Sequence, residues 1–312
     1  MAPLLEGAEE RRLVSRVPAV RMHDDELDVD AGLAGRLLAL QFPAWADLPL
    51  VPVLPAGTDH AIFRLGAEMS VRLPRRDGIE AQADLEAEWL PRIAPHLPLA
   101  IPVPLAIGPP DGGYPFRWAV NSWLPGEPAT HMRLRDPGEA ATDLARFVAA
   151  LRQIDSTGAP AAGRGAPLRT RDRQTRIWLA DLHGAVDTAA VTAMWEEALA
   201  APVWGGPPQW VHGDLDSRNL LATSGRLSGL VDFGGLGVGD PACDVGTAWK
   251  LFSGESRHRF RAELSVDDAT WMRARGHVLS QSLGALSYYT LENNAVLVTE
   301  ARRWLAEVLS DR

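Results

Sequence analysis

The amino-acid sequence predicts an α+β fold in which a β-rich N-terminal part precedes a larger, mostly helical part. Short apolar runs separated by turn glycines gather in the first third of the chain, and helical periodicity dominates after about residue 138. Residues 124–128 lie between the β-rich and the helical parts and contain Pro125-Gly126, which is typical of a connecting segment. We therefore expect an N-terminal extension over residues 1–23, a small lobe over 24–124 and a large lobe over 125–312.

The small lobe is predicted to hold an antiparallel sheet and one important helix. Residues 24–41 have acids in the first turn and leucines toward the end, which indicates a first amphipathic helix. Short β-type runs, a second helix and a further strand follow over residues 51–54, 61–65, 69–73, 79–94 and 118–123.

The large lobe is predicted to be helical around one compact β segment. The helical patterns cover residues 138–153, 172–183, 188–200, 241–252 and 268–309. Residues 209–232 form the β segment, and the Gly- and Ala-rich residues 158–167 are expected to form a surface loop.

Composition limits the class of protein. The 312 residues are 46% hydrophobic and 23% charged, and no apolar run is long enough for a membrane span. The net charge of −9 argues against nucleic-acid binding and is compatible with a cationic substrate, or simply with solubility. A single cysteine, Cys243, and the lack of a signal-peptide pattern predict a cytoplasmic protein. We expect a monomer or homodimer with no nucleic-acid or membrane partner.

Lysine is almost absent from this chain, because Lys250 is the only one among 31 basic residues. A phosphate-binding loop of the form GxxxxGK[ST] is therefore excluded. A lysine Schiff base is excluded everywhere except at Lys250.

The most informative segment is residues 211–247, VHGDLDSRNLLATSGRLSGLVDFGGLGVGDPACDVGT. Asn219 follows Asp214 by five residues, and Asp232 follows Asn219 by thirteen, with a predicted hairpin turn at Ser224-Gly225 between them. A loop carboxylate of this kind can meet an acceptor hydroxyl, while an amide oxygen and a second carboxylate share Mg²⁺. A lone loop aspartate is usually a turn or cap residue, but that explanation does not extend to the whole set.

This HGDxxxxN, DxG and GDPxxD series resembles the aminoglycoside phosphotransferase family, which has a bilobal protein-kinase-like fold. The resemblance runs from about residue 27 to the C-terminus. It implies a small-molecule kinase that uses Mg²⁺ and ATP or GTP, with Asp214 as the catalytic carboxylate and Asn219 and Asp232 as metal ligands. By the same resemblance, Asp240 and Asp244 brace the catalytic loop, and His212 shapes it by hydrogen bonding.

The same stretch contains a competing pattern. Residues 237–242 satisfy the G-x-G-x-x-A fingerprint of dinucleotide-binding folds. Pro241 and the lack of a surrounding β–α–β unit argue against that interpretation.

The resemblance also predicts nucleotide contacts in the small lobe. Gly57 and Thr58 lie between two predicted strands, where a turn can cradle phosphates, although any hairpin turn would look alike. Arg72 stands where many members have lysine, and Glu86 is its expected helix partner. Glu80 and Glu88 compete for that role, and a solvated helix face explains all three glutamates equally simply.

The predicted hinge between the lobes contains Ser122 and Leu124, whose backbone groups would bond the nucleotide base. In the catalytic loop, Arg218 either approaches the γ-phosphate or pairs with Asp216, and the pairing is favoured.

The acceptor is not defined by the sequence. Family resemblance favours an antibiotic-like hydroxyl compound, first an aminoglycoside, with a macrolide or small amino alcohol as alternatives. A nucleotide-binding protein of this fold with little turnover, and a dinucleotide enzyme built on Gly237, also remain open.

Overall fold

The computed structural model describes residues 26–54, 59–79, 81–130 and 134–311, and every structural statement below concerns these residues. The predicted extension over residues 1–23 lies outside them. The chain divides into two compact units. The first comprises the described residues up to Arg92 together with Pro102–Leu124, and the second comprises Ile93–Ile101 and the described residues from Pro125 onward.

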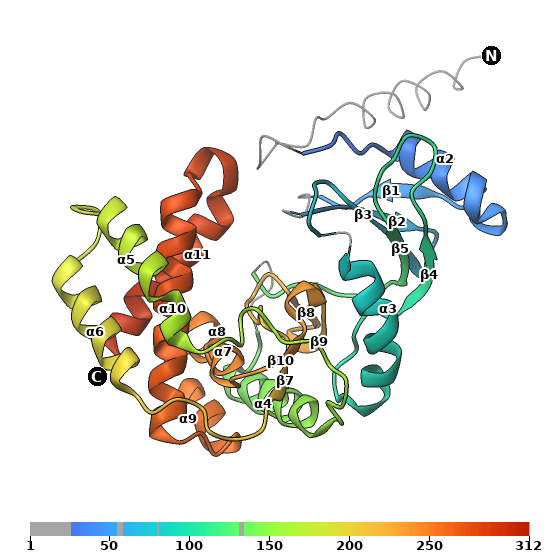
Figure 1. Cartoon of the computed structure of the whole chain (residues 1–312). Coiled ribbons are helices and arrows are strands. Elements are labelled where there is room, and N and C mark those ends of the chain that lie inside the picture. Colours follow the sequence, from blue (N-terminus) through green and yellow to red (C-terminus); the bar gives the residue numbers. More distant parts are fainter. Residues whose placement is uncertain (1–25, 55–58, 80, 131–133, 312) are drawn as a thin grey trace, which may run out of the picture. The chain divides into compact units, whose positions relative to one another are not determined.

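A five-stranded antiparallel sheet organises the first unit (Figure 1). Its order is β1 (Leu50–Pro52), β2 (His60–Leu65), β3 (Met69–Pro74), β5 (Trp118–Ser122) and β4 (Pro104–Gly108). Strand β4 was not predicted, because it is a proline-containing edge strand with an irregular register and little buried surface.

Helix α2 (Ala31–Gln41) packs on this sheet, and its start corrects the prediction. Asp30 is the N-cap, and its side chain accepts a hydrogen bond from the Leu33 N–H at 2.7 Å. The acids before Asp30 therefore precede the helix instead of filling its first turn. Ala34, Leu37 and Leu38 join the apolar core on the sheet. The 3₁₀ turn η1 (Pro43–Trp45) follows α2, and helix α3 (Ala81–Ile93) follows β3.

The second unit is mainly helical, as predicted. Its helices are α4 (Pro137–Gln153), α5 (Asp172–Asp181), α6 (Thr188–Ala200), α7 (Ala242–Val245), α8 (Thr247–Leu251), α9 (Gly254–Glu263), α10 (Asp268–Tyr288) and α11 (Leu291–Ser310), with short 3₁₀ turns η2 (Ala94–His96), η3 (Leu168–Arg171) and η4 (Phe233–Gly235). Helix α10 packs against α5, α6, α7 and α11, and α9 packs against α4 (Figure 1).

Two long predicted helices are each divided. The pattern over 241–252 is α7 and α8, which meet at Gly246, and the pattern over 268–309 is α10 and α11. Thr290 is the N-cap of α11 and forms a capping box with Asn293, so a new helix starts where α10 ends. Helix α9 was missed because it is almost entirely polar, and only Arg257 and Phe260 are buried.

The β segment of the second unit forms two small antiparallel sheets. Strand β7 (Gln209–Val211) pairs with β10 (Gly237–Gly239), and β6 (Glu127–Pro128), β8 (Leu220–Thr223) and β9 (Arg226–Leu230) form the other. The predicted hairpin turn joins β8 to β9, where Ser224 and Gly225 both have positive φ, as a tight hairpin requires. The predicted α+β class, with an antiparallel N-terminal sheet and a helical C-terminal part, is confirmed. Among the described helices, none combines the length and apolar character needed to cross a bilayer.

Candidate functional site

The predicted catalytic loop starts where β7 ends, and a carboxylate from α7 binds its backbone. The two side-chain oxygens of Asp244 accept the backbone N–H groups of His212 and Gly213, each at 2.8 Å, and Asp244 is fully buried. Gly213 has φ +83°, and a Cβ there would lie 2.7 Å from the Gly235 carbonyl oxygen. Only glycine therefore fits this position of the loop.

His212 fastens the loop to the end of β9. Its Nδ1 accepts the Asp214 N–H at 3.2 Å, and its Nε2 lies 3.1 Å from the Val231 carbonyl oxygen. Because Nδ1 is an acceptor, the proton sits on Nε2 and is donated to Val231. The imidazole thus orients the loop through both ring nitrogens, as the predicted shaping role requires.

Asp214 stands at the tip of this loop with 17% of its side chain exposed. Asn219 Nδ2 donates to the Asp214 main-chain oxygen at 2.9 Å and to Asp214 Oδ2 at 3.3 Å. Arg164 Nη1 forms an ion pair with Asp214 Oδ1. Burial raises the pKa of Asp214, but Arg164, followed by Lys250 and Arg218, outweighs burial and holds that pKa below its usual range. Asp214 is therefore held in its ionised form.

The two predicted metal ligands lie on neighbouring backbone. The Val231 N–H donates to the Asn219 carbonyl oxygen at 2.9 Å, which places Asp232 beside Asn219. Asp232 is exposed and has φ +65°, a conformation that costs energy for a residue with a side chain.

The donor chemistry of this pair fits Mg²⁺. With its Nδ2 turned to Asp214, Asn219 leaves Oδ1 without a hydrogen bond from any described residue. No three His, Cys, Asp or Glu side chains gather as a metal cluster in the described parts of the chain. A magnesium ion with one carboxylate, one amide oxygen and nucleotide phosphates needs no such cluster, because it is usually bound by one or two carboxylates plus phosphates.

Asp240 forms a second brace behind the loop. It receives Arg273 in a two-point ion pair, with Arg273 Nε 2.7 Å from Oδ2 and Arg273 Nη2 3.2 Å from Oδ1. The Ala242 N–H donates to Oδ1 at 2.9 Å, so the carboxylate also binds the first backbone N–H of α7. Both side chains are buried, and the pair joins α10 to the end of β10.

Arg218 pairs with Asp216, the favoured one of its two predicted roles. Arg218 Nε lies 3.0 Å from Asp216 Oδ1, and Arg218 Nη2 lies 2.6 Å from Oδ2. Asp216 is fully buried, so this ion pair forms part of the interior. Lys250 is buried as well, with Nζ 5.1 Å from the centre of the Trp304 ring, and burial lowers its pKa.

Arg164 is a functional candidate that sequence reasoning missed. It belongs to residues 158–167, which were predicted to be a surface loop, yet its guanidinium contacts Asp214. No local signal could have revealed it, because fifty positions separate the two residues.

Of the residues predicted to bind the nucleotide in the first unit, Arg72 and Glu86 are in contact. Arg72 Nη1 on β3 lies 2.6 Å from Glu86 Oε1 on α3, and the two side chains are only 12% and 2% exposed. Gln82 Nε2 also donates to Glu86 Oε1, at 2.5 Å. Glu88 instead faces Arg92 on the exposed side of the helix, and Glu80 lies outside the described residues.

The other small-lobe candidates are less defined. Gly57 and Thr58 lie outside the described residues. The Ser122 N–H donates to the Val103 carbonyl oxygen at 2.9 Å, so a nucleotide would have to use the Ser122 carbonyl group. The Leu124 N–H donates to no described residue.

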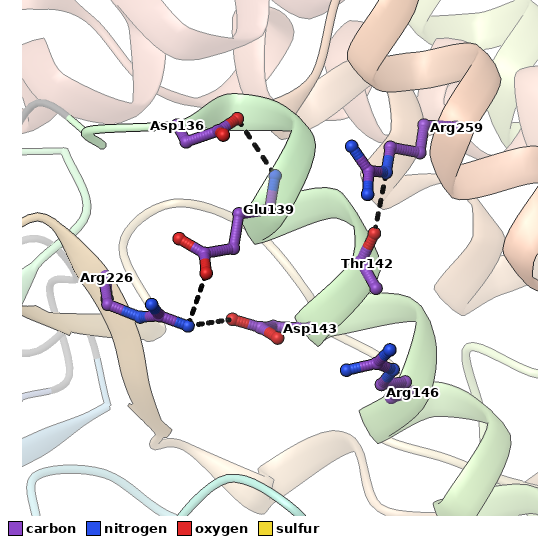
Figure 2. A pocket seen from close by; sticks show the side chains of 7 residues that line it. All are labelled: Asp136, Glu139, Thr142, Asp143, Arg146, Arg226 and Arg259. Carbon is purple, nitrogen blue, oxygen red and sulfur yellow. Dashed lines mark hydrogen bonds and ion pairs between the residues drawn. The ribbon is translucent and has the colours of Figure 1, made fainter.

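Two hollows of about 370 and 270 Å³ lie elsewhere on the helical unit. Figure 2 shows the larger one, which is lined by Asp136, Glu139, Thr142, Asp143, Arg146, Arg226 and Arg259. Arg226 pairs with Glu139 at 2.6 Å and with Asp143 at 3.8 Å, so these charges largely neutralise one another. Neither hollow contains a predicted site residue, and we assign no chemistry to them.

Solved structures share this fold. The GDP complex of wild-type aminoglycoside 2'-phosphotransferase-IIIa superposes with a TM-score of 0.68 at 16% identity, over 89% of this chain and 98% of that one. Macrolide 2'-phosphotransferase MphH from Brachybacterium faecium gives 0.60 at 22% identity, over 89% and 97%. ADP-bound APH(2'')-Ib gives 0.57 at 18%, over 90% and 99%. The predicted protein-kinase-like fold is confirmed.

The fold of this chain excludes the dinucleotide interpretation, because residues 237–239 form β10 of a two-stranded antiparallel sheet and no β–α–β unit.

No curated protein matches the sequence. The profile of the phosphotransferase enzyme family, however, matches residues 50–277, which is most of the chain. The predicted enzyme class is thereby confirmed, and the chain belongs to the phosphotransferase enzyme family.

Proposed function

We propose that this protein is a small-molecule kinase that transfers the γ-phosphoryl group of ATP or GTP to a hydroxyl of an antibiotic-like compound. The observation that carries the proposal is the arrangement at the β7–β8 loop. An ionised Asp214 is fixed by Asn219, and Asp232 follows on the adjacent backbone. Phosphoryl transfer depends mainly on such positioning and on charge neutralisation.

In this proposal, Asp214 takes the proton of the acceptor hydroxyl. The acceptor oxygen forms the new bond to the γ-phosphorus, and the bond from phosphorus to the β–γ bridging oxygen breaks, with its electron pair leaving on the nucleoside diphosphate. Asn219 and Asp232 would hold Mg²⁺, which supplies positive charge to the phosphates when bound.

The nucleotide half of the site is assigned to the first unit. Arg72, aligned by the buried Glu86, would grip phosphate oxygens with its planar fork. Gly57 and Thr58 would cover the phosphates, and the backbone of Ser122 and Leu124 would bond the base. The intact Arg72–Glu86 pair favours a nucleotide-competent enzyme over a fold with little turnover. Related structures contain GDP or ADP, so both donors belong in the test.

An aminoglycoside is the first candidate acceptor, since several similar structures are aminoglycoside phosphotransferases and one contains kanamycin. A macrolide is the second candidate. Similar structures favour the aminoglycoside, whereas the balance of charge around Asp214 favours the macrolide. The acids near Asp214 are matched by Arg164, Arg218 and Lys250, so no excess of negative charge awaits a polycation. Small amino alcohols are a further alternative. Use of ATP or GTP agrees with a cytoplasmic location.

The test is a phosphate-acceptance screen with the full chain. Kanamycin, gentamicin, streptomycin, a macrolide and choline-like amino alcohols are incubated with ATP or GTP and Mg²⁺, and mass spectrometry detects a product carrying one added phosphoryl group. Asp214→Ala is expected to lower transfer by about 10³-fold or more while nucleotide affinity changes by no more than about threefold. Unchanged transfer in Asp214→Ala would overturn the assignment.

A further inference from the structure

Residues 158–167 form a loop that is docked on strand β10. The Val238 N–H donates to the Pro160 carbonyl oxygen at 2.8 Å, and the Ala162 N–H donates to the Val238 carbonyl oxygen at 2.9 Å. On the other side of Arg164, the Asp240 N–H donates to the Gly165 carbonyl oxygen at 2.8 Å. The backbone of Arg164 is therefore anchored on both sides.

Two glycines of β10 make this docking possible. A Cβ at Gly237 would lie 2.7 Å from the Ala162 nitrogen, and a Cβ at Gly239 would lie 2.4 Å from the Gly165 carbonyl oxygen. Both distances are shorter than real Cβ contacts allow. The G-x-G sequence that imitates a dinucleotide fingerprint is thus explained by the close approach of this loop.

The guanidinium of Arg164 is held at the proposed catalytic carboxylate, but only one of its three nitrogens donates a hydrogen bond. Its Nη1 contacts Asp214 Oδ1 and lies 3.4 Å from the Gly213 carbonyl oxygen. Its Nε and Nη2 groups donate to no described residue, and 44% of the side chain is exposed. Unpaired N–H donors therefore stand beside Asp214 on a partly exposed side chain.

The other cations near Asp214 are already occupied or buried. Arg218 gives its fork to the buried Asp216, and Lys250 is 1% exposed over the Trp304 ring. In the described part of the chain, Arg164 is the one arginine or lysine that forms an ion pair with Asp214. It is therefore the cation placed to meet a ligand at this carboxylate.

We propose that Arg164 is a catalytic residue whose Nε and Nη2 groups bind the equatorial oxygens of the phosphoryl group during its transfer. This inference rests on the proposed function. The transferring group carries its charge on three equatorial oxygens, and a fixed guanidinium there stabilises the transition state more than the bound nucleotide. Arg164 keeps all its protons, while Asp214 takes the hydroxyl proton and the nucleoside diphosphate leaves with the bridging electron pair.

The test uses the full chain and does not require the acceptor to be known, because water can replace it. Arg164→Gln is expected to lower the kcat of Mg²⁺-dependent ATP or GTP hydrolysis by about 10²–10³-fold, with the nucleotide KM changed by about twofold or less. Arg164→Lys should recover part of kcat, since it restores the charge but not the fork. Arg169→Gln is the matched control, because Arg169 is exposed on η3 and contacts no described charged group.

A second measurement separates catalysis from binding. Affinity for Mg-ADP or Mg-GDP with aluminium fluoride, which imitates the transferring phosphoryl group, should fall by about 50-fold in Arg164→Gln, while affinity for the diphosphate alone stays within about twofold. Equal loss for both ligands, unchanged hydrolysis, faster hydrolysis, or an equal effect of Arg169→Gln would each overturn the proposal.

The two proposals fail in different ways. If the wild-type protein neither hydrolyses nor transfers phosphate, the proposed kinase function fails and the role of Arg164 fails with it. If the wild type is active and Asp214→Ala is inactive while Arg164→Gln is fully active, only the role of Arg164 is lost. Thermal unfolding of each variant, compared with the wild type, shows whether a loss of activity comes from loss of the fold.

Discussion

The Asp244 carboxylate accepts the Gly213 N–H at 2.8 Å through one oxygen, while its other oxygen accepts the neighbouring N–H of His212. Asp244 lies on α7 and is fully buried, so the direction of the predicted catalytic loop is set by a residue from another element. The position of Asp214 therefore depends on interior hydrogen bonds as well as on its own sequence neighbours.

Removing this brace should destabilise the protein. Asp244→Ala leaves two buried backbone donors without acceptors, and the expected loss in free energy of unfolding is about 2–4 kcal/mol. Asp244→Asn keeps one acceptor oxygen and should lose less. Urea denaturation measures both, with Asp47→Ala at an exposed site as the control. Equal stability of Asp244→Ala and Asp47→Ala would contradict the bracing role.

Replacing the Asp232 carboxylate should remove the magnesium dependence of nucleotide binding. Asp232→Asn is the cleanest variant, because asparagine tolerates the positive φ of this position. We expect the strengthening of nucleotide binding by Mg²⁺ to fall by about tenfold or more, as seen by calorimetry with and without Mg²⁺. Asp47→Asn serves as the control. A Mg²⁺ effect of wild-type size in Asp232→Asn would exclude Asp232 as a ligand.

Arg72 is predicted to serve the nucleotide through its fork. Arg72→Lys keeps the charge but loses the two-point geometry, so the nucleotide KM should rise by a few-fold, and Arg72→Met should raise it by about tenfold or more. Arg117→Met is the matched control, since Arg117 forms an exposed ion pair with Asp84 in the same unit. If Arg72→Met and Arg117→Met behave alike, Arg72 has no role in nucleotide binding.

His277 should make the protein less stable in mild acid. It is fully buried on α10, neither ring nitrogen has a partner among the described residues, and burial, with Arg171, Arg273 and Lys250 nearby, lowers its pKa to about 3. Since the unfolded chain binds this proton below about pH 6.5 and the folded chain does not, stability falls as the pH drops from 6.5 toward 3.

The expected cost at pH 5 is about 2 kcal/mol relative to pH 8. Denaturation at both pH values measures it. His277→Leu should show a pH dependence smaller by that amount, and His258→Leu, at an exposed position, should keep the wild-type dependence. The same slope in His277→Leu as in the wild type would show that His277 does not titrate on unfolding.

Gly239→Ala should disturb Arg164 without touching it. The added methyl would meet the Gly165 carbonyl oxygen at 2.4 Å, so the loop over residues 158–167 must move. We expect hydrolysis to fall by about tenfold or more, as the guanidinium loses its fixed direction. Gly163→Ala is the control in the same loop, because its Cβ would meet nothing within 4 Å. If the two variants hydrolyse nucleotide at comparable rates, the position of this loop does not matter for catalysis.

Local sequence was enough to predict the centre of the candidate site. Asp214, Asn219 and Asp232 are joined by a short loop and a hairpin, and the Ser224-Gly225 turn brings them together by backbone geometry alone. Strands β1, β2, β3 and β5 of the first unit were also predicted, because their apolar runs and turn glycines are local signals. Edge strand β4 and the polar helix α9 were missed, because neither buries a regular apolar face.

The sequence by itself determined the order of the acids, the hairpin between them, and the fact that Lys250 is the only lysine able to supply charge. The family resemblance named Asp240 and Asp244 as braces, but only the tertiary structure showed their partners, which are Arg273 for Asp240 and the backbone N–H groups of His212 and Gly213 for Asp244. The pairing of Arg164 with Asp214 was decided by the tertiary structure alone. Such contacts join elements far apart in the chain through long side chains, and they have no periodicity for a sequence to display. They form only when close packing brings the elements together, as Gly237 and Gly239 permit for the loop that carries Arg164.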